Sequence, residues 1–379
     1  MKKVIFVPDS FKGTLSSQEI CQTMAEAIRE EYPACQTLSV PVADGGEGSV
    51  DCFLSAVGGE KIFLTVTGPY FEPAEAFYGL IDGGKTAVIE MAACAGLPLV
   101  EERKNPEKTT TYGVGELILK AAERGCRRIV VGLGGSCTND GGTGAAAAIG
   151  VRFYNRAGES FVPVGGTLSE VVRIDASGRA PALDGVEIVT MCDIDNPLYG
   201  ENGAACIFGP QKGADEAMIR RLDSGLRQLS SCIARDIGTD FSELAGGGAA
   251  GGMGAGMAAF FGSRLQMGIE TVLDTVGFDR MLEGADAVFT GEGRLDAQSL
   301  RGKVVAGVAR RAKQAGVPVI VVAGGLDEGA EASYELGVSA AFSINRLPQD
   351  FSVSRRASRE NLAFAMKNIV RLWKAAGGR

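Results

Sequence analysis

Short apolar runs alternate with helical patterns along much of this chain. Residues 4–7, 287–290 and 317–323 are typical of buried strands, whereas 304–313 has the spacing of an amphipathic helix. Strands that alternate with helices predict an α/β fold with a parallel sheet, and ligands of such sheets bind at the carboxyl ends of the strands. Further strands are predicted at 129–131, 186–191 and 340–343, and further helices at 115–124, 331–336 and 356–375.

The overall composition excludes several classes of protein. A formal net charge of −8 without a basic stripe argues against a nucleic-acid partner. No run reaches the roughly 18 apolar residues of a membrane-spanning helix, and Asp9 and Lys12 interrupt the N-terminal apolar stretch that a signal peptide would need. Nine scattered cysteines without a CxxC pair predict reduced thiols, and we therefore expect a cytoplasmic protein with no membrane contact.

Histidine is absent from the chain. This excludes Ser–His–Asp triads, HExxH zinc sites and histidine general bases. Acid–base chemistry would have to use Asp, Glu, Lys, Tyr or Cys. Phosphoryl transfer remains compatible with the composition, because it depends mainly on positioning, Mg²⁺ and neutralisation of charge.

Glycine is unusually frequent, with 54 residues in 379, or about 14% against a typical value of about 7%. Each glycine inside a helix or strand costs up to about 1 kcal/mol, so clusters of glycine favour loops in which backbone approaches a ligand. Ordinary turns explain any single glycine equally well.

Two glycine patterns resemble nucleotide motifs only superficially. Residues 79–86 fit the expression GxxxxGK[ST], but strand-like sequence lies on both sides, so we predict a β-hairpin that turns at 82–84. The spacing of Gly246, Gly248 and Gly251 occurs in a run where chance produces it. The run 246–256 is expected to be either a flexible connector or a tight turn that contacts phosphate.

Two polar loops early in the chain are candidates for anion binding. Asp9, Ser10 and Lys12 lie between the first strand and the first helix, where a lysine beside a helix N-terminus suits a carboxylate or phosphate. Alternatively, Asp9 caps the turn and Lys12 is solvated. Asp44 lies among glycines that would let a ligand approach closely, although a surface turn explains that sequence too.

The loop 134–142 is the best nucleotide-binding candidate, because it combines backbone N–H groups, hydroxyls and the start of a helix. Its candidate residues are Gly134, Gly135, Ser136, Thr138, Asn139 and Asp140, the last two as ligands of a metal or ribose. The alternative is a loop with a purely structural role.

Carboxylates and one lysine complete the candidate set. Asp193 and Asp195 end a strand and could coordinate Mg²⁺ through hard oxygens, or cap local amides instead. Glu292 and Asp296 follow another strand, where one could accept a hydroxyl proton, although Asp296 could be a helix N-cap. Lys212 is expected to be an exposed lysine, either solvated or in contact with the nucleotide.

Five segments together resemble the bacterial type-1 glycerate kinases. They are DSFKGTLS (9–16), ADGGEG (43–48), GLGGSCTNDGG (132–142), FGPQKGA (208–214) and TGEGRLDAQS (290–299). The resemblance extends in order from the N-terminus to about residue 325. One small departure is Cys137, where the family pattern leads us to expect alanine.

The resemblance implies ATP- and Mg²⁺-dependent phosphorylation of glycerate, with 2-phosphoglycerate favoured over 3-phosphoglycerate, in the breakdown of organic acids such as glyoxylate or aldarates. It also implies two dissimilar α/β domains with the active site in a cleft between them. We expect residues 1–60 and 265–379 to form a Rossmann-like or flavodoxin-like domain, with 61–264 inserted as a mixed α/β domain. The sequence carries no signal for an oligomeric state.

The resemblance also suggests residue roles. Asp9, Ser10, Lys12 and Asp44 would bind glycerate, and the 134–142 loop with Lys212 would bind nucleotide. Asp193 and Asp296 are the candidates for proton acceptance, with Glu292 in support, and Asp193 is also the candidate for metal binding. The rivals are a galactokinase-like enzyme, whose proline-rich lead-in to the phosphate loop is missing here, and a two-lobed sensor of small acids, which would not need carboxylates beside phosphate loops.

Overall fold

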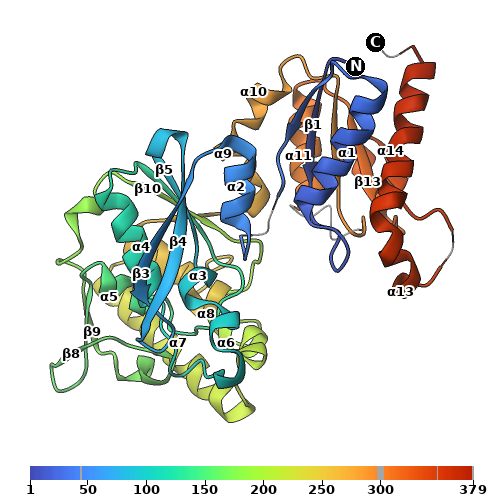
Figure 1. The fold of residues 1–379 in the computed structure, drawn as a ribbon. Coiled ribbons are helices and arrows are strands. Elements are labelled where there is room, and N and C mark those ends of the chain that lie inside the picture. The colour runs from blue at the N-terminus through green and yellow to red at the C-terminus, as the bar shows by residue number, and fades with distance from the viewer. Residues whose placement is uncertain (43–44, 297–302, 348, 378–379) are drawn as a thin grey trace. The chain divides into compact units, whose positions relative to one another are not determined.

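The computed structural model describes residues 1–42, 45–296, 303–347 and 349–377. The chain forms two compact units (Figure 1). The first contains Met1–Ala43, Asp51–Gly58 and Met267–Arg379, and the second contains Asp44–Val50 and Gly59–Gln266. Helix α2 (Ser49–Val57) therefore has residues in both units, and the 44–50 segment belongs to the second. The prediction of an α/β protein with parallel sheets is confirmed.

A parallel sheet of five strands, in the order β14-β13-β12-β1-β2, forms the first unit. Its strands are β1 (Lys3–Pro8), β2 (Gln36–Ser39), β12 (Ala287–Gly291), β13 (Val319–Ala323) and β14 (Val338–Ser343). Counted within the unit, this is the flavodoxin-like order 2-1-3-4-5, in which ligands bind where the strand order reverses. That point lies between β1 and β12, where Pro8 pairs with Gly291.

Helices cover both faces of this sheet. Val4, Phe6 and Phe289 belong to one apolar cluster with α1 and α14, which Figure 1 shows side by side. Helix α11 contacts β1, β12 and β13 on the other face of the sheet. Because successive side chains of a strand point to opposite faces, Ile5 and Val288 lie on the face that α11 covers. The helices are α1 (Ser17–Glu31), α9 (Gly268–Val276), α10 (Phe278–Leu282), α11 (Val304–Gln314), α12 (Ser333–Leu336), α13 (Phe351–Ser354) and α14 (Ser358–Ala375).

The second unit contains a mixed sheet of six strands in the order β11-β10-β6-β5-β4-β3. Its strands are β3 (Glu60–Thr67), β4 (Pro73–Ile81), β5 (Thr86–Glu90), β6 (Arg128–Gly132), β10 (Glu187–Met191) and β11 (Arg264–Gln266). Strands β5, β6, β10 and β11 run parallel, whereas β3, β4 and β5 are antiparallel neighbours. The predicted hairpin at 82–84 is confirmed, and the GxxxxGK[ST] pattern therefore lies between two strands instead of before a helix.

Helices and a small antiparallel sheet, β8-β7-β9, complete the second unit. These elements are α3 (Ala92–Ala95), α4 (Tyr112–Glu123), α5 (Thr143–Ala148), β7 (Arg152–Tyr154), β8 (Ser160–Phe161), β9 (Arg173–Asp175), α6 (Ala204–Phe208), α7 (Glu216–Asp236) and α8 (Ala249–Phe261). The glycine-rich segment enters α8 through left-handed residues at Ala250, Gly251 and Gly252. Residues 246–256 were expected to form a flexible connector or a tight turn, and neither expectation included the helix that part of this segment forms.

All nine cysteines lie in the described part of the chain, and each is a free thiol. Among the described residues, no helix combines the length and apolar character needed to cross a membrane.

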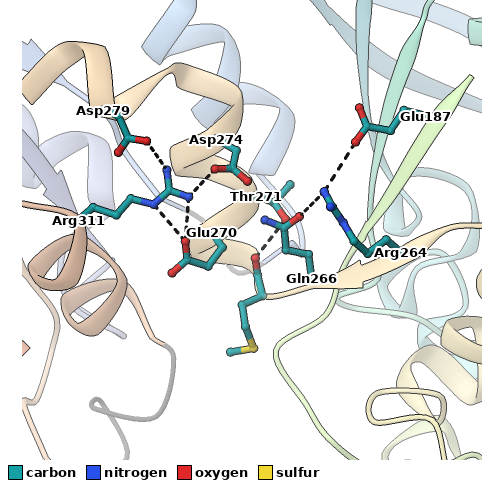
Figure 2. Close-up of polar contacts among 9 residues, drawn as sticks. Glu187, Arg264, Gln266, Glu270, Thr271, Asp274, Asp279 and Arg311 are labelled. Atoms are coloured by element: carbon teal, nitrogen blue, oxygen red, sulfur yellow. Dashed lines mark hydrogen bonds and ion pairs between the residues drawn. The ribbon is translucent and has the colours of Figure 1, made fainter. Parts of the chain in front are cut away.

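An ion-pair cluster ties three helices of the first unit together. Figure 2 shows the Arg311 guanidinium of α11 facing Glu270 and Asp274 of α9 and Asp279 of α10. Its Nη2 lies 2.9 Å from Glu270 Oε2 and also pairs with Asp274, and its Nη1 lies 3.4 Å from Asp279 Oδ2. The Arg311 side chain is only 17% exposed, so water screens these pairs less than ordinary surface pairs.

We expect Arg311→Met to lower the free energy of unfolding by about 1–3 kcal/mol, because three carboxylates lose their shared partner. Urea unfolding followed by fluorescence tests this, since the single tryptophan, Trp373, lies in α14 of the same unit. The exposed neighbour Arg310 provides the matched control, and Arg310→Met should change stability by less than about 0.5 kcal/mol. Equal stabilities of the two variants would contradict a role for the cluster.

Candidate active site

The loops that follow β1 and β12 meet at the reversal of strand order in the first unit. The backbone N–H of Asp9 donates to the carbonyl oxygen of Gly291 over 2.8 Å. A Cβ atom on Gly293 would lie 3.4 Å from the backbone nitrogen of Lys12, so the two loops are in contact. The fold thus brings the Asp9–Lys12 segment close to Glu292, although they are about 280 residues apart in the chain.

The candidate residues of these two loops, Asp9, Lys12, Glu292 and Asp296, form a first cluster and differ in exposure. Lys12 is exposed, Asp9 and Asp296 are half-buried, and Glu292 is buried. Asp9 Oδ1 accepts the Ser10 N–H over 2.6 Å, so the Asp9 carboxylate contacts the backbone of its own loop. Helix α11 begins at Val304 with Lys303 at its N-cap, and Asp296 is therefore not the N-cap of that helix.

A third loop, which the sequence analysis did not single out, joins the same cluster. The Gly324 N–H donates to Glu292 O over 3.1 Å, the Leu295 N–H donates to Gly325 O over 3.0 Å, and Arg294 pairs with Asp327. The sequence signal for this loop is the pair Gly324 and Gly325 directly after the strand predicted at 317–323. Glycines directly after a strand also mark the other candidate loops.

A second cluster lies at the carboxyl ends of neighbouring strands in the second unit. Gly132, at the end of β6, pairs with Glu90 of β5 on one side and with Met191 of β10 on the other. The 134–142 loop and Asp193 therefore follow adjacent strands at one edge of the sheet. Asp193 and Asp195 are both exposed.

Asp140 is fully buried and organises the loop that contains it. Its carboxylate accepts hydrogen bonds from Thr111 N and Oγ1 at 2.8 and 2.9 Å, and from the N–H groups of Gly142 and Gly144. Burial raises the pKa of Asp140, whereas these hydrogen bonds act to lower it. With this many donors around it, the carboxylate supports the loop and the start of α5.

The expectation that Lys212 is exposed is wrong. Its side chain is 2% exposed, and its Nζ donates to Ser136 Oγ over 2.8 Å and to the Thr138 carbonyl oxygen over 2.7 Å. Burial lowers its pKa from 10.5 to about 8, because the charged ammonium loses solvation. Lys212 therefore holds the 134–142 loop from within.

Several polar groups of this loop are without a hydrogen-bond partner in the part of the chain that the structure describes. Among the described residues, no hydrogen bond engages the side chain of Asn139 or the Thr138 hydroxyl, although both residues are fully buried. The backbone N–H groups of Gly135 and Ser136 also lack an acceptor in this part of the chain, and Gly135 is exposed. Unengaged amides at and beside the exposed Gly135 are suited to an anion such as phosphate.

The glycine segment 45–48 packs directly against the start of this loop. A Cβ on Gly132 would lie 2.2 Å from Gly45 O, and one on Gly134 would lie 2.5 Å from Gly46 Cα. The Gly134 N–H donates to Gly45 O over 3.0 Å. Only glycine permits this approach, so two loops that the sequence presented separately form one structure. Asp44 itself lies outside the described residues.

The carboxylates of Asp193 and Asp195 suit a Mg²⁺ ion that also binds substrate phosphates. Within the described part of the chain, they do not form a metal site whose ligands all come from the protein. Among the described residues, no group of three or more Cys, Asp or Glu side chains is placed to hold a metal ion. Mg²⁺ commonly binds through one or two carboxylates together with substrate phosphates. The exposed, hard oxygens of Asp193 and Asp195, beside the candidate phosphate loop, fit that pattern.

Comparison with known proteins identifies relatives over nearly the whole chain. A sequence model described as the glycerate kinase family matches residues 4–374. A glycerate kinase of Bacillus cereus is 44% identical over 375 residues, covering 99% of this chain and 98% of the relative. The glycerate 2-kinase of Escherichia coli K12 is 43% identical over 369 residues, covering 97% of each. A crystal structure from Salmonella typhimurium LT2, provisionally named glycerate kinase 2, has a TM-score of 0.88 and 41% identity and covers 100% of both chains.

The low pKa of Lys212 leads to a prediction about stability and pH. Between about pH 8 and 10.5 the unfolded chain binds a proton at Lys212 that the folded chain lacks, so stability should rise with pH in this window. The penalty for burying the ammonium is fully present below about pH 8.

We expect the wild-type protein to become more stable relative to Lys212→Met as pH increases from about 7.5 to about 10, an interval that covers most of this window. Urea unfolding followed by circular dichroism measures the difference. Lys108→Met, at an exposed lysine, should give a difference that is independent of pH. A Lys212→Met difference that is equally flat would show that the lysine does not titrate in the folded protein.

Proposed function

This chain belongs to the glycerate kinase family, and we propose that it transfers the γ-phosphoryl group of ATP to a hydroxyl of glycerate with the help of Mg²⁺. We favour the 2-hydroxyl as acceptor, which gives 2-phosphoglycerate, because one full-length relative is named glycerate 2-kinase. We place the reaction in cytoplasmic breakdown of organic acids, such as routes through glyoxylate or aldarates.

The packing of segment 45–48 against the start of the 134–142 loop carries this proposal. The contact between Gly45 and Gly132 puts the predicted glycerate loop beside the predicted phosphate loop at the carboxyl edge of one sheet. Phosphoryl transfer depends chiefly on positioning donor and acceptor, and two loops in backbone contact support that positioning.

In the second unit, we assign the nucleotide phosphates to the backbone amides of Gly135 and Ser136, of which Gly135 is exposed. Lys212 and Asp140 support this loop from within through their hydrogen bonds to its residues and to Thr111. Asp193 would hold Mg²⁺, which neutralises charge on the transferring phosphoryl group when it is bound. The unpartnered side chain of Asn139 is a further candidate for contact with nucleotide.

In the first unit, we assign the glycerate carboxylate to Lys12, with Asp9 and Ser10 beside it. Asp44 would contribute from the segment that precedes Gly45. Asp296 is the proposed proton acceptor, supported by the buried Glu292, which follows the same strand, β12. Histidine is absent from the chain, so a carboxylate takes this role.

The proposed reaction is balanced without a further reactant. The glycerate hydroxyl oxygen forms a bond to the γ-phosphorus, and the bond from that phosphorus to the β,γ-bridging oxygen breaks, which releases ADP. The hydroxyl proton passes to the carboxylate and then to water.

ADP release measured in a coupled assay with a panel of small hydroxy acids and Mg²⁺ tests the proposal. We expect turnover with glycerate, and ³¹P and ¹H NMR of the product would assign the phosphate to the 2-position. Absence of glycerate-dependent ADP release would overturn the function, whereas a 3-phosphoglycerate product would overturn only the choice of hydroxyl.

We expect Asp296→Asn and Asp193→Asn each to lower kcat by about 100-fold or more, the usual contribution of a proton acceptor or a metal carboxylate. Raising the Mg²⁺ concentration should partly restore Asp193→Asn but not Asp296→Asn, which separates the two roles. Asp240→Asn, at an exposed carboxylate that accepts the Ser242 N–H, is the matched control. Near-normal kcat in both site variants would refute these assignments.

A further inference from the structure

Glu90, the last residue of β5, is a buried carboxylate with no role in the proposed chemistry. Its side chain is 2% exposed. Its Oε2 accepts the Gly48 N–H over 3.2 Å, and its Oε1 accepts the Val50 N–H over 2.5 Å. The two residues it holds are about 40 positions away in the chain and flank the first residue of α2.

Glu90 accepts these hydrogen bonds at the start of helix α2, where backbone N–H groups need an acceptor. The first N–H groups of a helix have no acceptor inside the helix, and the helix dipole adds positive potential there. A carboxylate that accepts two of these N–H groups makes charge-assisted hydrogen bonds, which are stronger than neutral ones. Glu90 thus acts on α2 as a capping residue from a distant strand.

The position of Glu90 connects this cap to the two glycine loops. Glu90 pairs with Gly132 across β5 and β6, and Gly132 lies against Gly45. Ser49, also buried, donates from its hydroxyl to the Gly46 carbonyl oxygen over 2.7 Å. The segment 45–50 is therefore held at Gly45 by the phosphate loop and at Gly48 and Val50 by Glu90.

We propose that Glu90 is a positioning residue for catalysis, whose carboxylate fixes segment 45–50 against the 134–142 loop and so sets the geometry of the glycerate-binding loop. This inference rests on the proposed function, because it assigns that loop to glycerate. Since Glu90 acts through the backbone of another segment, its loss should affect glycerate more than ATP.

Glu90→Gln tests the proposal, because glutamine has nearly the same shape but can accept with only one of its two terminal atoms. We expect kcat/KM for glycerate to fall by about tenfold or more, the KM for ATP to stay within about twofold, and the melting temperature to stay within about 5 °C. Glu75→Gln, at an exposed carboxylate on the neighbouring strand β4, should behave like the wild type. Glu90→Gln with the kinetic constants of Glu75→Gln would overturn the proposal.

Hydrogen–deuterium exchange provides a readout that a general loss of stability would not reproduce. Peptides that cover residues 45–57 should exchange faster in Glu90→Gln, whereas peptides from α4 and α7 should match the wild type. Unchanged exchange over 45–57 would contradict the cap. This measurement does not depend on catalysis, so it shows whether Glu90 holds segment 45–50 even if the wild type has no glycerate-dependent activity, a result that would refute the proposed function.

Ser49→Ala covers the case in which Glu90→Gln does not fold. It removes the hydrogen bond from the Ser49 hydroxyl to the Gly46 carbonyl oxygen, which also holds segment 45–50, without leaving a charged group buried. An increase of about threefold or more in the glycerate KM, at an unchanged melting temperature, supports the proposal. Wild-type kinetics in Ser49→Ala, together with an unfolded Glu90→Gln, would assign Glu90 a purely structural role and overturn the inference.

Discussion

Direct contact between two backbone segments underlies the candidate site of the second unit. The start of the 134–142 loop and segment 45–48 approach so closely that a methyl group on Gly132 or Gly134 would overlap backbone atoms of Gly45 and Gly46. Close approach of this kind needs glycine, and it explains why the chain accepts the entropic cost of so many glycines. Hydrogen bonds accepted by Glu90 and donated by Ser49 also hold segment 45–50.

Buried charged groups supply most of that support. Lys212 holds the loop through Ser136 and Thr138, Asp140 holds it through Thr111 and the start of α5, and Glu90 holds the segment opposite. Each of them satisfies backbone or hydroxyl groups that a tight glycine-rich loop would otherwise leave unpaired. The exposed carboxylates Asp193 and Asp195 remain at the surface, where a metal and phosphates can reach them.

The first unit uses a different device for the same purpose. Its parallel sheet brings the loops after β1, β12 and β13 together where the strand order reverses, and hydrogen bonds between the loops link Asp9 to Gly291 and Glu292 to Gly324. Arg311 secures α9 and α10 to α11 in the same unit. Candidate residues from opposite ends of the sequence are neighbours here because parallel strands align their carboxyl ends.

Local patterns were sufficient wherever a short segment decides its own conformation. The hairpin at 82–84 and the strands predicted at 4–7, 129–131 and 287–290 follow from residues within one turn or one strand. Burial is not a local property, and for that reason the expectation for Lys212 was wrong. The role of Glu90 could not be predicted from the sequence either, because nothing local to the end of strand β5 indicates that its last residue contacts the start of α2.

The amino-acid sequence by itself determined the α/β class, the glycine-rich loops after the strands and the absence of histidine chemistry, since each depends on composition or short-range periodicity. Its five family segments also identified the relatives that whole-chain comparison then found. Only the tertiary structure decided that Gly45 lies against Gly132, that Lys212 is buried and that Glu90 caps α2. These are contacts between residues far apart in the chain, and their energies depend on how the strands align and on how little space is left between them.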